Sequence, residues 1–212
     1  SLYWQLNDCW PGASWSSIDY YGKWKALHYK VKESFAPIII SHEFVNGDLQ
    51  LSVISDLLKD FEGEIEVVLS EFKDIEKILR WHKKITVGAN LTKRVLTIPA
   101  EQLTSGIDQK HTYLQLFLFD KTGVISKKNV YFLPFKDIIL PRPELEFSTE
   151  HDKKNKLYVT VTSKNFARGV HVTCNSPNNF SDNFFDLPIQ GSKTLESEDQ
   201  KNYLKSYLDY CR

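Results

Sequence analysis

The sequence has no methionine and only three cysteines among its 212 residues. Cys9, Cys174 and Cys211 are widely spaced, and no CxxC pair occurs. The six histidines show no metal-ligand spacing such as HExxH. We therefore expect no metal site and no cofactor. A disulfide between Cys174 and Cys211 and a pair of free thiols both remain open, because buried free cysteines are common.

The sequence also lacks an excess of either charge and any long apolar run. Lys and Arg together number 27, as do Asp and Glu, so the formal net charge is zero. A nucleic-acid-binding chain would carry a basic excess. The longest apolar run, residues 36–40, is far too short to span a bilayer. We expect neither a nucleic-acid nor a membrane partner.

The chain begins without an initiator methionine and inside a pattern of alternating apolar and polar residues, residues 1–7. A native chain rarely starts in this way, so we expect a fragment of a longer protein. The lack of a leader sequence then says nothing about the compartment.

The composition that is present belongs to a globular protein, with 42% hydrophobic and 13% aromatic residues. The first segment, residues 1–37, is expected to form a strand over residues 2–7, a loop over 8–22 and a helix over 23–35. Four apolar residues give this helix one stripe at spacings of three or four: Trp24, Leu27, Val31 and Phe35. Pro37 ends it.

The rest of the chain is expected to be mainly β. In residues 38–140 about seven short strands alternate with turns, and Asn46-Gly47 is a strong hairpin signal. Pro141-Arg142-Pro143 then resembles a stiff linker, and residues 141–212 contain further strand patterns. Short strands with frequent turns indicate two immunoglobulin-like β-sandwiches.

The first segment also carries the strongest functional signal. Four tryptophans lie within the first 24 residues, among amide and carboxylate side chains such as Gln5, Asn7 and Asp8. A sugar site needs aromatic platforms for C–H faces and polar groups for hydroxyls. For Trp10, Trp15 and Trp24 a place in the core is an equally good interpretation.

Two stretches resemble a known family. Residues 4–11 read WQLNDCWP, followed by SWSSIDYYGKWKALHY at 14–29 and FAP at 35–37. These resemble glycoside hydrolase family 2 β-mannosidases at the end of the catalytic barrel. SKNFARGV at 163–170 and FSDNFFDL at 180–187 resemble the C-terminal β-domain of the same enzymes. The resemblance covers essentially the whole chain.

The resemblance implies that residues 1–37 are the last strand, loop and helix of a (β/α)₈ barrel, whose site lies at the carboxyl ends of the strands. Trp4 would then pack where a terminal mannose binds, with Asn7 and Asp8 near the rim. The family's two catalytic glutamates lie on earlier strands, so this chain holds no catalytic residue. A local substitute among Glu64, Glu66, Glu71, Asp74 and Glu76 is not expected, because these residues fall on solvated faces.

The implied parent is a retaining, exo-acting enzyme that removes terminal non-reducing β-D-mannose from manno-oligosaccharides or glycans, and the rest of its barrel would be the partner of this chain. Such enzymes are periplasmic or secreted in bacteria and lysosomal in animals. Two alternatives remain. One is a carbohydrate-binding or scaffolding module with a sugar site near Trp81, Phe184 or Phe185. The other is a family 2 β-galactosidase or β-glucuronidase.

Overall fold

The computed structural model describes residues 2–74, 77–154, 156–173, 179–197 and 207–210. The chain forms two compact units. One consists of Phe35–Leu140, and the other joins Ser1–Ser34 to Pro141–Arg212. The N-terminal segment therefore packs with the C-terminal part of the chain and not with the residues that follow it.

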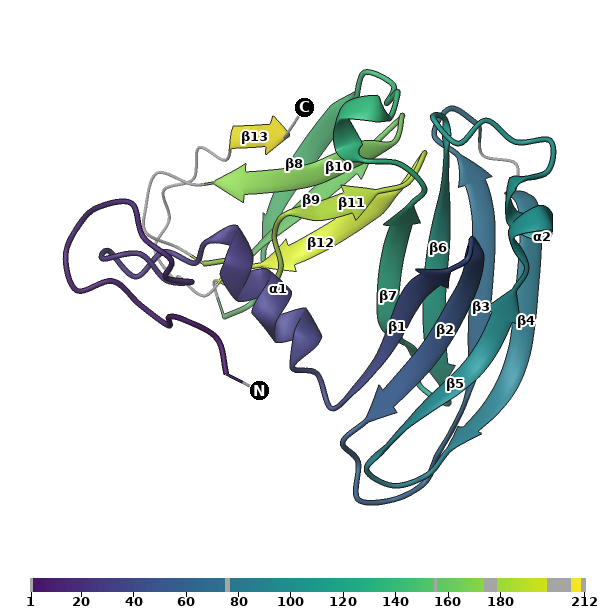
Figure 1. Cartoon of the computed structure of the whole chain (residues 1–212). Coiled ribbons are helices and arrows are strands. Elements are labelled where there is room, and N and C mark those ends of the chain that lie inside the picture. The colour runs from purple at the N-terminus through teal and green to yellow at the C-terminus, as the bar shows by residue number, and fades with distance from the viewer. Residues whose placement is uncertain (1, 75–76, 155, 174–178, 198–206, 211–212) are drawn as a thin grey trace. The chain divides into compact units, whose positions relative to one another are not determined.

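The Phe35–Leu140 unit is an antiparallel sandwich of two sheets, with strand orders β1-β2-β5 and β4-β3-β6-β7 (Figure 1). Its elements are β1 Ile38–Val45, β2 Asp48–Ser55, β3 Phe61–Glu71, β4 Lys77–Val87, β5 Leu91–Ile98, α2 Ala100–Thr104, β6 Thr112–Asp120, β7 Gly123–Tyr131 and the 3₁₀ turn Phe135–Asp137. The expected immunoglobulin-like architecture is confirmed here.

Alternation of side chains explains this sandwich. Along β2, Leu49, Leu51 and Val53 are fully buried while the residues between them are half-buried. Strand geometry sends successive side chains to opposite faces, so one face of each sheet fills the core. The Asn46-Gly47 hairpin is also confirmed: both residues have positive φ, 53° and 90°, as a type I′ turn requires.

The second unit contains one helix, α1 Ala26–Ser34, and two three-stranded sheets, β12-β9-β8 and β11-β10-β13. Its strands are β8 Leu145–His151, β9 Leu157–Ser163, β10 Ala167–Thr173, β11 Phe185–Leu187, β12 Ser192–Glu196 and β13 Tyr207–Tyr210. The sequence did not predict β12. The core of this second unit includes Val159, Val161, Val170, Phe180 and Leu195. Cys174 and Cys211 lie outside the described residues, so the disulfide remains a prediction.

Two expectations for the first segment are wrong in detail. Residues 2–7 form no strand, and only an isolated bridge joins Asn7 to Ile18. The backbone of this segment bonds instead to residues 17 and 18 of its own loop. The helix is shorter than expected, and its buried residue is Tyr29, whereas Leu27 of the predicted stripe is 39% exposed. Tyr29 is buried because it lies against the C-terminal sheets, with its ring centroid 6.0 Å from that of Phe184.

Neither helix of the described residues is long and apolar enough to cross a membrane. Within the same residues, no group of three or more His, Cys, Asp or Glu side chains is placed to hold a metal ion.

Candidate functional site

The N-terminal loop is held by backbone hydrogen bonds between its two ends. The amide of Ile18 donates to the Leu6 carbonyl at 2.9 Å, and the amide of Asp8 donates to the Ile18 carbonyl at 3.1 Å. The Ser17 hydroxyl donates to the same Leu6 carbonyl at 3.0 Å. These bonds fix residues 6–8 beside 17–18, so the residues between them form a closed loop.

An ion pair between a buried carboxylate and a half-buried lysine organises the interior of this loop. The Asp8 side chain is only 5% exposed, and its Oδ2 lies 3.0 Å from Lys25 Nζ. Ser14 Oγ donates to the other carboxylate oxygen of Asp8. Lys25 Nζ also donates to Ser16 Oγ at 2.7 Å. The pairing and the hydrogen bonds offset the cost of burying the carboxylate, and through them Asp8 ties the loop to the residues that precede α1.

The same contacts keep Asp8 ionised. The hydrogen bond from Ser14, with further contributions from Ser16 and Lys25, outweighs the effect of burial and lowers the pKa of Asp8 below its ordinary value of 3.8. At neutral pH this residue is a carboxylate, and it has no free proton to give to a substrate.

Three tryptophans of the segment stand in solvent. Trp4, Trp10 and Trp15 are 76%, 74% and 78% exposed. Large apolar side chains gathered on one loop are unusual on a free surface and mark a site of interaction. For Trp10 and Trp15, the interpretation as core residues of this chain is therefore wrong.

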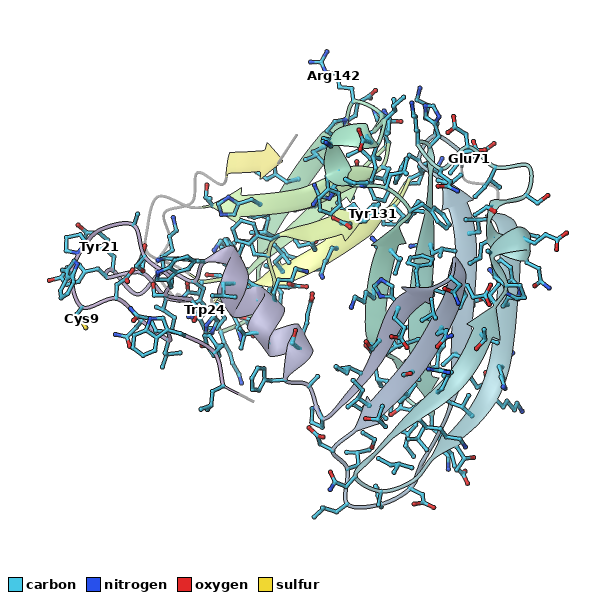
Figure 2. The ribbon with its side chains drawn as sticks, viewed as in Figure 1. Cys9, Tyr21, Trp24, Glu71, Tyr131 and Arg142 are labelled. Atoms are coloured by element: carbon cyan, nitrogen blue, oxygen red, sulfur yellow. The ribbon has the colours of Figure 1, made fainter. Side chains whose placement is uncertain are left out.

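The fourth tryptophan is packed inside its unit. The Trp24 ring centroid lies 4.5 Å from that of His28 and 5.7 Å from that of Tyr29. Figure 2 shows Trp24 next to the first turn of α1, whereas Cys9 and Tyr21 lie at the outer end of the loop. Trp24 thus helps to hold α1 in place. The exposed tryptophans of the loop are Trp4, Trp10 and Trp15.

An asparagine of the C-terminal part clamps the segment. Asn179 Oδ1 accepts a hydrogen bond from the Trp24 amide at 2.9 Å, and Asn179 Nδ2 donates to the Gly22 carbonyl at 3.1 Å. Lys32 of α1 donates to the Ser181 carbonyl at 2.9 Å. This clamp was not expected from the sequence, although Asn179 directly precedes the FSDNFFDL stretch that resembles the family.

The three predicted substrate-binding residues therefore have different surroundings. Trp4 is open to solvent, and Asn7 is exposed with its side-chain amide donating to the Asp8 carbonyl at 3.3 Å. Asp8 is buried in the ion pair with Lys25. Asn7 and Asp8 are adjacent because they are consecutive residues. Their binding of a sugar stays a prediction.

The positions suggested for an independent sugar site are packed. Trp81 lies against the core of the Phe35–Leu140 unit. In the other unit Phe184 stacks on His171 with a centroid distance of 4.3 Å, and Phe185 is 6% exposed. None of these rings is a free platform.

Two of the candidate carboxylates of the first sandwich are paired with basic side chains on the neighbouring strand. Glu64 lies 2.8 Å from His82 Nε2, and Glu66 lies 2.9 Å from Arg80 Nε. Glu76 lies outside the described residues. Cross-strand ion pairs of this kind are ordinary features of a solvated sheet face and give no reason to assign catalysis to them.

Comparison with known proteins places these features in a family. A family profile described as "Mannosidase Ig/CBM-like domain" matches residues 47–137, and one described as "Ig-fold domain" matches residues 140–206. "Beta-mannosidase A" of Aspergillus oryzae is 33% identical over 183 residues, covering 77% of this chain and 19% of the relative. "Beta-mannosidase" of the mouse is 27% identical over 191 residues, covering 87% of this chain and 22% of the relative.

Two solved structures of glycoside-cleaving enzymes are also similar to this chain. The β-D-mannosidase of Dictyoglomus thermophilum matches with a TM-score of 0.82 and 25% identity, over 98% of this chain and 25% of that protein. The exo-chitosanase CsxA of Amycolatopsis orientalis matches with a TM-score of 0.65 and 18% identity, over 99% of this chain and 30% of that one. The second likeness concerns the fold alone.

The fold and these matches define a class first: the chain carries immunoglobulin-like domains of the kind found in glycoside hydrolases. More narrowly, it belongs to the glycoside hydrolase family 2 β-mannosidases. It spans about a fifth of the length of the curated relatives that it matches, 19% for the Aspergillus oryzae protein.

Proposed function

We propose that this chain is the part of a retaining, exo-acting β-mannosidase that follows the catalytic glutamates, and that it completes the sugar site without performing the chemistry. Its first segment contributes the final loop and helix of the (β/α)₈ barrel, and the C-terminal sheets brace that segment. The substrate of the longer protein is a terminal, non-reducing β-D-mannose residue of an oligosaccharide or glycan.

One observation carries the proposal: the N-terminal loop is internally organised yet exposes its tryptophans. The Asp8 carboxylate is buried against Lys25, whereas Trp4, Trp10 and Trp15 are about three-quarters exposed. A segment that existed only to fill a core would bury the rings. A loop that keeps a fixed shape while presenting them fits a surface completed by further protein and by sugar.

We infer a separate role for each of the three residues, and their surroundings support it. Trp4 offers its ring face to the apolar C–H face of a mannose unit. The exposed amide of Asn7 reaches a sugar hydroxyl at the rim. Asp8 positions both, because its carboxylate is engaged by Ser14 and Lys25 and holds the loop closed.

The test is a substitution of Trp4 in the longer protein. Trp4→Ala should lower kcat/KM for p-nitrophenyl-β-D-mannoside by roughly tenfold or more, because the loss of about 1.4 kcal/mol of ring contact corresponds to a factor of ten. Val124→Ala is the control, since Val124 is 51% exposed on β7 and belongs to the other unit of the chain. Equal activity of the Trp4 variant and the control would count against the assignment.

The same assay separates the alternatives. Preference of the longer protein for a β-galactoside or a β-glucuronide would identify another family 2 specificity. Binding of manno-oligosaccharides to the present chain, without turnover by the longer protein, would favour a carbohydrate-binding module. We place the protein in a secretory, lysosomal or periplasmic compartment, by analogy with the family.

A further inference from the structure

Two triplets of the sequence match the acceptor pattern for N-glycosylation, Asn90-Leu91-Thr92 and Asn179-Phe180-Ser181. The pattern is short, and in the sequence the two triplets look equivalent. The structure gives their asparagine side chains opposite surroundings.

The Asn90 residue is exposed to solvent at a turn. It lies between β4 and β5 with φ of 48°, a conformation that asparagine tolerates well. Its backbone amide is satisfied by the Leu57 carbonyl at 2.8 Å. No hydrogen bond of its side-chain amide occurs within the part of the chain that the structure describes, and Thr92 is exposed as well.

Two exposed leucines lie beside Asn90, near the Asp60 carboxylate that accepts a hydrogen bond from the Ala89 amide. Leu58 is 94% exposed and Leu91 is 50% exposed. The hydrogen bond from Asn90 to Leu57 brings the turn at residues 88–90 next to Leu58. The C–H faces of the first sugar rings on Asn90 would cover these two leucine side chains, which are otherwise left in water.

Asn179 is occupied. Its oxygen accepts from the Trp24 amide and its nitrogen donates to the Gly22 carbonyl, so both ends of the amide hold the N-terminal segment. The hydroxyl of Ser181 accepts from the Glu196 amide at 3.0 Å. A sugar on Asn179 Nδ2 would stand where residues 22–24 now lie and would break the clamp.

We propose that Asn90 is an N-glycan acceptor of this protein and that Asn179 is not. The donor is an oligosaccharide activated as a diphosphate ester. Asn90 Nδ2 forms a bond to the anomeric carbon of the first sugar, and the bond between that carbon and the diphosphate oxygen breaks. The diphosphate leaves with the electron pair, and one amide proton is lost to a base.

The test is secretion of the whole chain from eukaryotic cells behind an added signal peptide. The secreted chain should migrate as a larger species, and digestion with a peptide N-glycosidase should abolish the shift and leave aspartate at position 90. Asn90→Gln and Thr92→Ala should each lose the shift. Thr92→Ser, which keeps the acceptor pattern, and Asn179→Gln should retain it.

The expected result is a single glycan, mapped to Asn90 by peptide mass. A shift that persists in Asn90→Gln would overturn the proposal, as would a glycan mapped to Asn179 or an unmodified Asn90 in the secreted protein. If Asn179→Gln reduces secretion, the peptide map of the unsubstituted chain still decides between the two sites.

Discussion

At the scale of single residues, the protonation of a buried histidine makes the stability of the fold depend on pH. His42 lies on β1, and within the described residues its Nδ1 is buried without a hydrogen-bond partner. Burial first, and the positive charge of Lys128 second, lower the pKa of His42 below its ordinary value of 6.5. The folded state therefore favours the neutral ring, while the unfolded chain takes up a proton near pH 6.5.

It follows that His42 weakens the fold as the solution becomes acidic. Below pH 6.5 the unfolded state binds more protons, so the free energy of unfolding should fall between pH 7.5 and 5.5. His42→Leu should reduce this fall, and His151→Leu, at an exposed position on β8, should not. Urea unfolding at both pH values measures the difference. An unchanged pH dependence in His42→Leu would show that this histidine is not the cause.

A glycine of β3 gives a second prediction at the residue scale. A Cβ on Gly63 would lie 2.3 Å from the Phe119 carbonyl oxygen and 2.5 Å from Phe61 Cζ, closer than real Cβ contacts. Gly63→Ala should therefore lower the free energy of unfolding by about 1–3 kcal/mol. In Gly12→Ala the nearest heavy atom lies 3.9 Å away, so its effect should stay within about 0.5 kcal/mol. Equal stability of the two variants in urea would refute the steric argument.

Among the elements, α1 depends on the C-terminal sheets. The Asn179 clamp joins residues 155 positions apart, and the Trp24 amide is its donor. Asn179→Ala should accelerate hydrogen exchange at the Trp24 amide by about fivefold, because a hydrogen bond contributes about 1 kcal/mol. Asn90→Ala is the control, since that side chain makes no hydrogen bond among the described residues. Unchanged exchange at Trp24 in the Asn179 variant would mean that the clamp does not hold the residues before α1.

Elements also show what the sequence could and could not predict. The strands of the first sandwich were predictable because apolar residues alternate, and because Asn46-Gly47 specifies a two-residue turn. The strand β12 was missed because Leu195 is the single apolar side chain in Ser192–Glu196. Its pairing with β9 depends on backbone bonds that leave no trace in the pattern.

The candidate site was predictable only in part. The aromatic and amide composition of the first segment pointed to Trp4, Asn7 and Asp8. The burial of Asp8 was not foreseen, because it depends on Lys25, a residue 17 positions away. The alternation over residues 2–7 predicted a strand, but a strand requires a neighbouring ladder, and here the backbone bonds to its own loop.

At the scale of the whole molecule, the two units have different relations to the proposed site. The unit of Ser1–Ser34 and Pro141–Arg212 unites the tryptophan loop with the sheets that clamp it, so the C-terminal sandwich acts as the anchor of the loop. The Phe35–Leu140 unit is inserted between these two parts of the sequence. Its core closes on itself without them.

By our proposal, this chain binds and positions the sugar and supports the site, whereas the chemistry belongs to the longer protein. The most direct measurement compares the two with p-nitrophenyl-β-D-mannoside. Retaining hydrolysis needs two carboxyl groups about 5–5.5 Å apart. We expect the longer protein to release p-nitrophenol and this chain, at high concentration, to release none above background. Turnover by the repurified chain alone, or a longer protein that leaves the mannoside intact, would contradict this division of roles.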